Sequence, residues 1–197
     1  MDFLSRKVIL GACVLLAIAG GILYYSASSG LGGIPSSFTE ARGAAARVSQ
    51  DIVTLTTKTN KTIEEINTAE RTGSTSQVLN LIDEARATNA RAYEKAFELS
   101  KNLRQMTESL SRIGPRESQR LAYEAIAIEL SLTSEFITYT GALSDFLNTL
   151  AKTTTTGSFG NRQATIRELA TVNGKAAIIN NLNREFNEKM TAFDASL

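Results

Sequence analysis

Residues 76–113 read SQVLNLIDEARATNARAYEKAFELSKNLRQMTESLSRI, and this stretch decides the fold. Apolar and small residues recur in it at alternating spacings of three and four, a heptad pattern typical of a long helix packed against other helices. Leu81, Tyr93 and Phe97 widen the stripe, which favours a helix within a bundle over a two-stranded coiled coil. The positions expected to face inward are Val78, Ile82, Ala85, Asn89, Ala92, Ala96, Leu99, Leu103, Met106, Leu110 and Ile113.

The flanking stretches of the chain show the same periodicity. One starts at a capping-box sequence, Ser37-Phe38-Thr39-Glu40, and is expected to form a helix to about Arg71. A second runs from Pro115 to about Lys152, and a third from Asn161 to the C-terminus. Their expected inward positions are Phe38, Ala41, Ala45, Val48, Ile52, Leu55, Thr59, Thr62, Ile66 and Ala69; then Leu121, Ala125, Ile128, Leu132, Phe136, Tyr139, Leu143, Phe146 and Leu150; then Ile166, Leu169, Val172, Ala176, Ile179, Leu182, Phe186, Met190, Phe193 and Leu197.

Three breaks separate these helices. Thr72–Thr75 and Gly114-Pro115 are short turns, whereas Thr153–Asn161 (TTTTGSFGN) is expected to be a long loop. Short connections make successive helices antiparallel. The sequence therefore predicts an all-α fold, an up-down-up-down four-helix bundle over residues 36–197 with long, coiled-coil-like heptads. The Gly73 turn and the Thr-rich loop would share one end of this bundle.

Ahead of the bundle, residues 8–25 form an uncharged apolar run, VILGACVLLAIAGGILYY, preceded by Arg6 and Lys7. At the rise of an α-helix the run spans about 27 Å, close to the thickness of a bilayer's hydrocarbon core. Because basic residues mark the cytoplasmic end of a span, we interpret it as a single-pass transmembrane signal anchor in the cell (inner) membrane. Residues 1–7 would lie in the cytoplasm, and a flexible Gly/Ser linker, residues 26–35, would lead to a periplasmic or extracellular bundle.

Two other processing routes for this segment stay open. Ala27-Ser28-Ser29 could serve as the cleavage site of a removed signal peptide, and Leu10-Gly11-Ala12-Cys13 looks like a lipobox. If the anchor is retained, Cys13, Ala17 and Gly21 share one face, and such a small-residue stripe lets two transmembrane helices approach closely. Small residues are also simply common in membrane helices.

Composition narrows the functional classes. The chain has no histidine, which excludes Ser-His and Cys-His nucleophile pairs and imidazole-based metal sites, so we expect no enzyme activity, no cofactor and no metal. Acidic and basic residues are balanced at a net charge of +1, so no nucleic-acid partner is expected. Cys13 is the single cysteine, so no disulfide can form within the predicted bundle.

Two places in the bundle are candidate sites. The first is the Thr-rich loop, where Phe159, with Thr155 and Thr156, would contact a partner, unless Phe159 folds back to plug the bundle end. The second is a layer of polar residues at similar heights on three helices. It would form either a small ligand cavity or a polar layer that fixes helix register. Its members are Thr59, Thr62, Asn89 and Asn173.

The sequence thus favours a membrane-anchored, non-enzymatic structural or protein-interaction module that projects a helical bundle outside the cytoplasm. It would act with a protein partner or as a homo-oligomer. The alternative is an extracytoplasmic ligand-binding or sensory four-helix bundle that works with a partner protein, an analogy made at the level of the fold alone.

Overall fold

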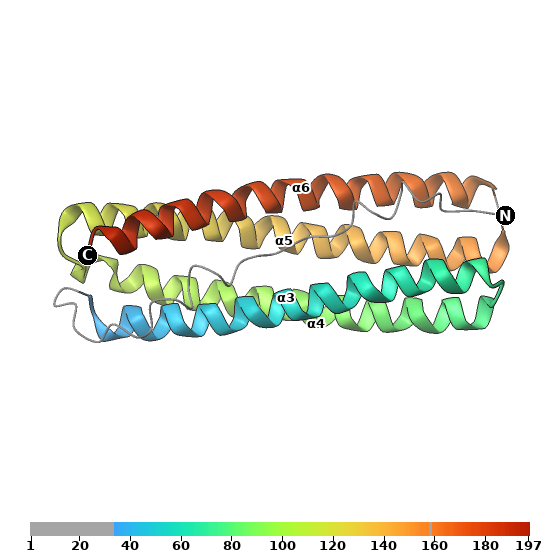
Figure 1. Cartoon of the computed structure of the whole chain (residues 1–197), viewed down its shortest axis with the longest axis horizontal. Coiled ribbons are helices and arrows are strands. Elements are labelled where there is room, and N and C mark those ends of the chain that lie inside the picture. The colour runs from blue at the N-terminus through green and yellow to red at the C-terminus, as the bar shows by residue number, and fades with distance from the viewer. Residues whose placement is uncertain (1–33, 158) are drawn as a thin grey trace.

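The structure, a computed structural model, describes residues 34–157 and 159–197, and of Phe159 only the backbone. The helices lie side by side along the long axis of the molecule and alternate in direction, which confirms the all-α antiparallel up-down bundle (Figure 1). The elements are α3 (Ser36–Arg71), α4 (Thr75–Ser109), the short 3-10 helix η1 (Leu110–Arg112), α5 (Arg116–Thr156) and α6 (Phe159–Ala195).

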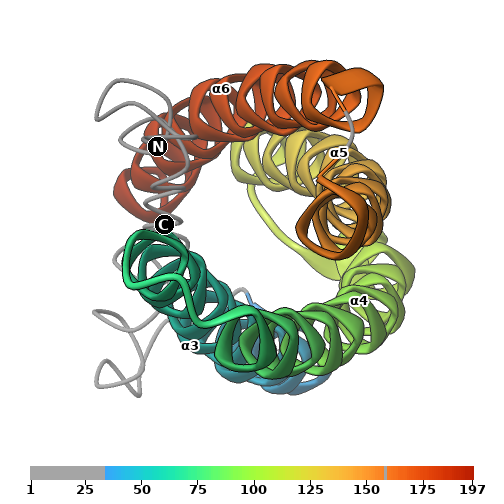
Figure 2. The ribbon, with the colours of Figure 1, turned by 90° about the vertical axis from the view of Figure 1, so that its right-hand side faces the viewer.

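The helices form a ring in chain order when the bundle is viewed end on (Figure 2). Backbone packing is most extensive within the two hairpins, α3/α4 and α5/α6, and less extensive where α4 meets α5. Between α3 and α6 the backbones come close only sparsely. These two helices meet at one end of the bundle, where the ring centroids of Phe38 and Phe193 are 5.8 Å apart.

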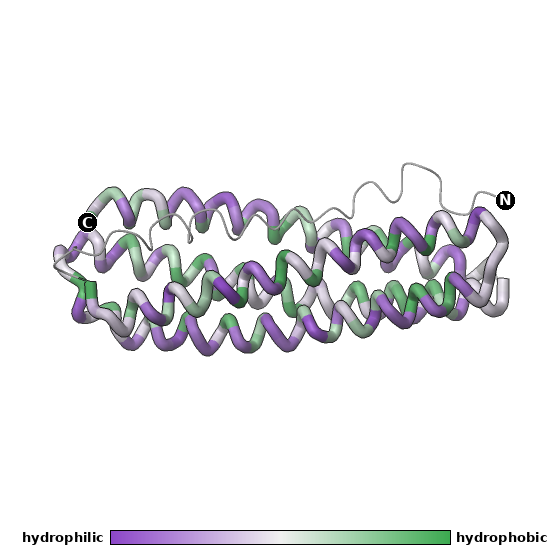
Figure 3. The backbone as a smooth tube through the Cα atoms, turned by 60° about the horizontal axis from the view of Figure 1, so that its bottom comes forward, coloured by the Kyte–Doolittle hydropathy of each residue, from purple (hydrophilic) through white to green (hydrophobic). Residues whose placement is uncertain are grey.

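The core follows the heptad pattern of each helix. In α4 and η1, all of the inward positions expected from Val78 to Leu110 are buried, and so is Ile113 after them. Hydrophobic and hydrophilic residues alternate along every helix, as expected for elements with one face in the core (Figure 3). The largest fully buried side chains are Tyr139, Phe38, Phe136, Phe146, Phe193, Ile52, Ile66, Ile82, Leu99, Leu132 and Leu143.

Three apolar residues expected in the core are exposed instead, and four other expected inward positions, Leu55, Ile128, Leu182 and Leu197, are only partly buried. Tyr93 and Phe97 were expected to widen the buried stripe of α4 but are 41% and 47% exposed. On α6, Ile166 is exposed and Thr165 is buried in its place. Thr165 continues the spacing of Leu169 and its successors, and its hydroxyl forms a 2.9 Å hydrogen bond with the Thr153 hydroxyl, which offsets the loss of an apolar side chain.

The predicted long loop from Thr153 to Asn161 is wrong, because helix fills most of it. The hydroxyls of Thr155 and Thr156 donate to the carbonyl oxygens of Ala151 and Lys152, so the threonines are accommodated within the last turn of α5. The helix ends at Gly157, which adopts a left-handed conformation with φ of 63°. Helix α6 begins at Phe159, so Asn161 is its third residue rather than the start that the sequence predicts.

Helix starts also differ in detail from the prediction. Helix α3 begins at Ser36 after Pro35 and has no side-chain cap, so the capping box at Ser37 is wrong. The Ser37 hydroxyl instead forms a 2.8 Å hydrogen bond with the Ser109 hydroxyl at the end of α4. The last turn before Ile113 is a 3-10 helix, not a continuation of α4.

The predicted anchor, residues 8–25, and most of the predicted linker lie outside the described residues. Within the part of the chain that is described, none of the helices combines the length and apolarity needed to cross a bilayer.

Gly73 gives the turn between α3 and α4 its shape. Its φ is 76°, its N–H donates to the Glu70 carbonyl, and the N–H of Ser74 donates to the Ala69 carbonyl, a Schellman arrangement. By contrast, Gly141 lies exposed in the middle of α5. A Cβ at either position would meet no atom within 4 Å.

The two glycines should therefore respond oppositely to alanine. Gly73→Ala forces a β-carbon into the left-handed region and should lower the free energy of unfolding by about 1 kcal/mol. Gly141→Ala removes a flexible residue from a helix interior and should raise it by about 0.5–1 kcal/mol. Urea denaturation measures both, and equal shifts in the two variants would contradict the assigned turn.

Candidate functional site

The tip residues predicted to contact a partner lie at one end of the bundle. Thr155 and Thr156 are exposed on the last turn of α5, and the Thr156 hydroxyl also accepts a 2.9 Å hydrogen bond from the side-chain amide of Asn161. The side chain of Phe159 lies outside the described part of the chain. Contact with a partner at this tip therefore stays a prediction.

The predicted polar layer is divided among separate interactions. The side-chain amide of Asn89 donates to the Thr140 carbonyl at 2.8 Å and to the Ser144 hydroxyl at 3.1 Å, so it ties α4 to α5. The hydroxyls of Thr59 and Thr62 donate hydrogen bonds to backbone carbonyls of their own helix, those of Leu55 and Lys58.

Asn173, the fourth member of the layer, is half-buried on α6. Within residues 34–157 and 159–197, no hydrogen bond joins its side chain to Asn89, Thr59 or Thr62. Asn89 has the contacts of a residue that fixes helix register, and a ligand cavity at this layer stays a prediction.

The small-residue stripe proposed for the membrane segment, Cys13, Ala17 and Gly21, lies outside the described residues.

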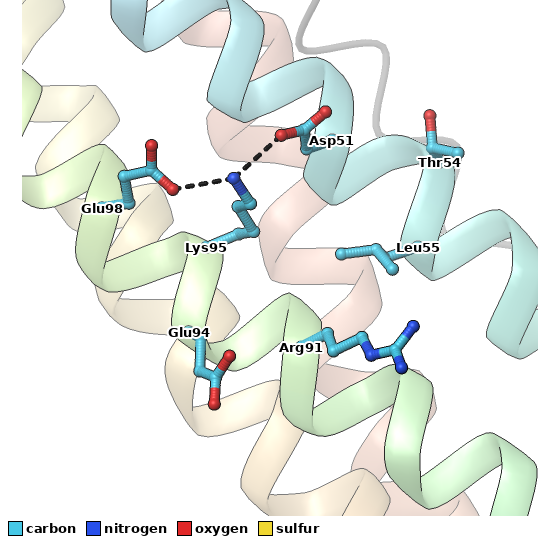
Figure 4. Close-up of a pocket in the computed structure, with 7 residues that line it drawn as sticks. All are labelled: Asp51, Thr54, Leu55, Arg91, Glu94, Lys95 and Glu98. Atoms are coloured by element: carbon cyan, nitrogen blue, oxygen red, sulfur yellow. Dashed lines mark hydrogen bonds and ion pairs between the residues drawn. The ribbon is translucent and has the colours of Figure 1, made fainter.

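A groove runs between α3 and α4 on the outside of the bundle, with a volume of about 410 Å³ (Figure 4). Lys95 of α4 bridges it, since its ammonium group lies 3.0 Å from the Asp51 carboxylate of α3 and 2.8 Å from the Glu98 carboxylate. Hydrogen bonds to Glu98 and then to Asp51 raise the pKa of Lys95. The residues that line the groove are Asp51, Thr54, Leu55, Arg91, Glu94, Lys95 and Glu98.

On its other flank, α4 exposes an aromatic pair. The rings of Tyr93 and Phe97 meet edge to face, with centroids 4.9 Å apart. Their flank faces α5, because Arg86 and Asn89, near the same side of α4, donate to carbonyls of α5. Rigid aromatic side chains on a helix are typical anchors of protein interfaces.

A buried ion pair joins α3 to α6 at the end of the bundle where the C-terminus lies. The Arg42 guanidinium donates two hydrogen bonds to the Asp194 carboxylate, at 2.7 and 2.8 Å, and lies 5.8 Å from the ring centre of Phe193. A bidentate pair of this kind fixes orientation as well as contributing energy.

A second acidic group lies in the core beside this pair. Glu129 of α5 is 1% exposed, and neither of its carboxyl oxygens has a hydrogen-bond partner among the described residues. Burial raises the pKa of Glu129 to about 8, so the group is protonated at neutral pH. It borders a cavity of about 10 Å³, room for about one water molecule, lined by Arg42, Ala45, Leu103, Met106, Ile126, Glu129, Phe186 and Met190.

Neither Arg42 nor Glu129 was singled out from the sequence. Arg42 lies four residues after Phe38 and three before Ala45, and Glu129 lies three residues after Ile126 and three before Leu132. A charged residue at such a spacing inside an apolar stripe is the signal that could have found both. Their partners lie on other helices, so the pairing itself required the structure.

Within residues 34–157 and 159–197, no three His, Cys, Asp or Glu side chains gather as they would around a metal ion.

No family model matches this chain, and no curated protein or solved structure matches it either.

Glu129 should make the stability of the bundle depend on pH. Its folded-state pKa is raised from 4.5 to about 8, so the free energy of unfolding should fall as pH rises between those values. Glu129→Gln removes the titration and should raise the free energy of unfolding at pH 7 by on the order of 3 kcal/mol. Urea denaturation from pH 5 to pH 9 tests this.

Glu94→Gln serves as the control, because Glu94 is an exposed acid on α4. Parallel pH profiles for the wild-type chain and Glu129→Gln would show that Glu129 does not titrate in the folded state as described.

Proposed function

We propose that this chain is a non-enzymatic, membrane-anchored interaction protein, held by residues 8–25, that presents its helical bundle outside the cytoplasm. Two features support this proposal. The apolar run has the length and basic flank of a signal anchor. The bundle begins at Ser36, about ten residues after the run, so it would stand close to the membrane surface.

The observation that carries the interaction role is the exposed aromatic pair of α4. Exposed apolar groups that gather on a rigid element mark interaction sites in soluble domains. The Asn89–Thr140 hydrogen bond sets the register between α4 and α5, and counting from it places Ile137 of α5 at the height of Tyr93. We infer that Tyr93, Phe97 and the partly buried Ile137 form an apolar surface along the outer α4/α5 seam, which we call the aromatic flank.

The charged groove on the opposite flank of α4 complements this surface. Its exposed side chains include Asp51, Glu94 and Glu98 together with Arg91, so a partner that reaches around α4 would meet charges of both signs. Such charges favour one orientation and the rate of encounter more than affinity. A helix or strand with apolar residues and mixed charges fits this arrangement.

A ligand-binding or sensory role is the second candidate, and the observation in its favour is the cavity beside Glu129. The cavity has a volume of about 10 Å³ and is enclosed by all four helices. A ligand larger than water would have to separate those helices. We therefore place the interaction role first.

Photo-crosslinking in the full-length protein in native membranes tests the proposal. With benzoylphenylalanine replacing Tyr93, we expect capture of one partner of defined mass, and a several-fold lower yield when Phe97→Ser is added. Phe97 is about half exposed, so that substitution should change the free energy of unfolding by less than about 1 kcal/mol.

The same probe at Asn80, exposed on α4, is the control, and at Thr155 it tests the predicted tip site. Equal capture at Asn80, or none at Tyr93, would exclude the aromatic flank as the interface. Capture from Thr155 alone would move the interface to the tip of the bundle.

A further inference from the structure

The facing sides of α3 and α6 carry polar residues at heptad spacing. On α3 these are Arg42, Ser49 and Thr56, each seven residues after the last. On α6 they are Asn173, Asn180, Asn187 and Asp194, again seven residues apart. A polar residue repeated every seven positions forms a continuous stripe along one side of a helix, so the α3/α6 seam differs chemically from the apolar core.

Apart from the Arg42–Asp194 pair, each of these side chains has a buried oxygen atom with no hydrogen-bond partner within residues 34–157 and 159–197. The hydroxyl oxygens of Ser49, 0% exposed, and Thr56, 3% exposed, lack partners. So do the buried amide oxygens of Asn60 on α3 and of Asn173, Asn180 and Asn187 on α6. Thr59 and Thr62, on the same helix, satisfy their hydroxyls with carbonyls of α3, so the orphaned groups are a property of this side of the helix.

The register between the helices places these groups opposite one another. The Arg42–Asp194 ion pair fixes one point of the antiparallel seam. Counting seven residues forward on α3 and seven back on α6 brings Ser49 opposite Asn187, and the next step brings Thr56 opposite Asn180.

The backbones of α3 and α6 approach each other at few points. The polar groups at matching heights therefore face each other across the seam without hydrogen bonds between them. Figure 2 shows α3 and α6 as the first and last helices of the ring.

Such groups are stable only if water satisfies them. An unpaired buried polar group costs about 1–3 kcal/mol, and native proteins supply ordered water at such places. Solvent reaches the α6 side of this seam at Asn187, which lines an open depression of about 550 Å³ together with Asn183, Arg184, Glu188 and Thr191 of the same helix. A hydrated polar seam contributes less cohesion than the apolar seams within the two hairpins.

We propose that the α3/α6 seam is a hydrated slot along which the α3/α4 and α5/α6 hairpins separate, with the Arg42–Asp194 pair as the clasp that limits this opening. The Phe38–Phe193 contact lies at the same end and supports the clasp. At the other end of the seam, burial raises the pKa of the Glu70 carboxyl. The positive charge of Arg162 attracts this carboxyl and partly offsets that rise. The slot does not depend on the proposed interaction role, but opening would give a partner access to the apolar core.

Pulsed electron-electron distance measurements on the full-length protein test this. Spin labels at Gln50 and Arg184, both exposed and about two residues apart in height on α3 and α6, report on the seam in a Cys13→Ser background. Labels at Thr57 and Ala90, exposed on α3 and α4, report on the hairpin as the control. Asp194→Asn should add an α3–α6 population longer by roughly 10 Å, about one helix diameter, and leave the α3–α4 distance unchanged.

A second variant works in the opposite sense. Thr56→Val with Asn180→Leu replaces two facing polar groups by apolar ones, so it should dry the slot and narrow the α3–α6 distance distribution. The proposal is overturned if the α3–α6 distances do not respond to either variant. It is also overturned if both label pairs broaden together, because that result indicates general loss of structure rather than separation of hairpins.

Discussion

Burial of one apolar stripe per helix is the constraint on which this bundle depends. The single cysteine, Cys13, precedes the helices, so no disulfide holds them together, and most ion pairs are exposed and weak. Long helices are stabilised mainly by packing of an amphipathic face. The unbroken heptads of α4 and η1 supply that face from Val78 to Leu110, and α5 packs against both α4 and α6.

Buried polar residues interrupt this apolar pattern, and their hydrogen bonding differs from one helix interface to the next. Asn89 bonds across α4 and α5 and fixes their register, at little cost because both amide hydrogens are used. Glu129 has no partner and is held in its neutral form by burial. Along α3 and α6, orphaned hydroxyl and amide groups replace apolar side chains. The backbones therefore pack closely within the two hairpins, α3/α4 and α5/α6, and have few contacts across the seam between α3 and α6.

Sequence periodicity predicted the number of long helices, their antiparallel order and nearly every core position. It could do so because apolar residues at heptad spacing lie on one face of a helix, and that face must be buried. It misplaced Ile166, since a hydrogen-bonded Thr165 took the inward position. It treated the Thr-rich segment as a loop, although hydroxyl bonds to the preceding turn let threonine stay helical. The partners of Arg42 and the isolation of Glu129 depend on contacts between distant helices, which no local pattern contains.

We propose that residues 8–25 hold the bundle at a membrane, outside the cytoplasm, where its surface meets a partner. The most direct test is to label Thr155→Cys, in a Cys13→Ser background, with a maleimide that cannot cross membranes, since residue 155 is exposed on the bundle. We expect labelling of membrane-bound protein in cells whose inner membrane is intact. Labelling only after that membrane is permeabilised would contradict it.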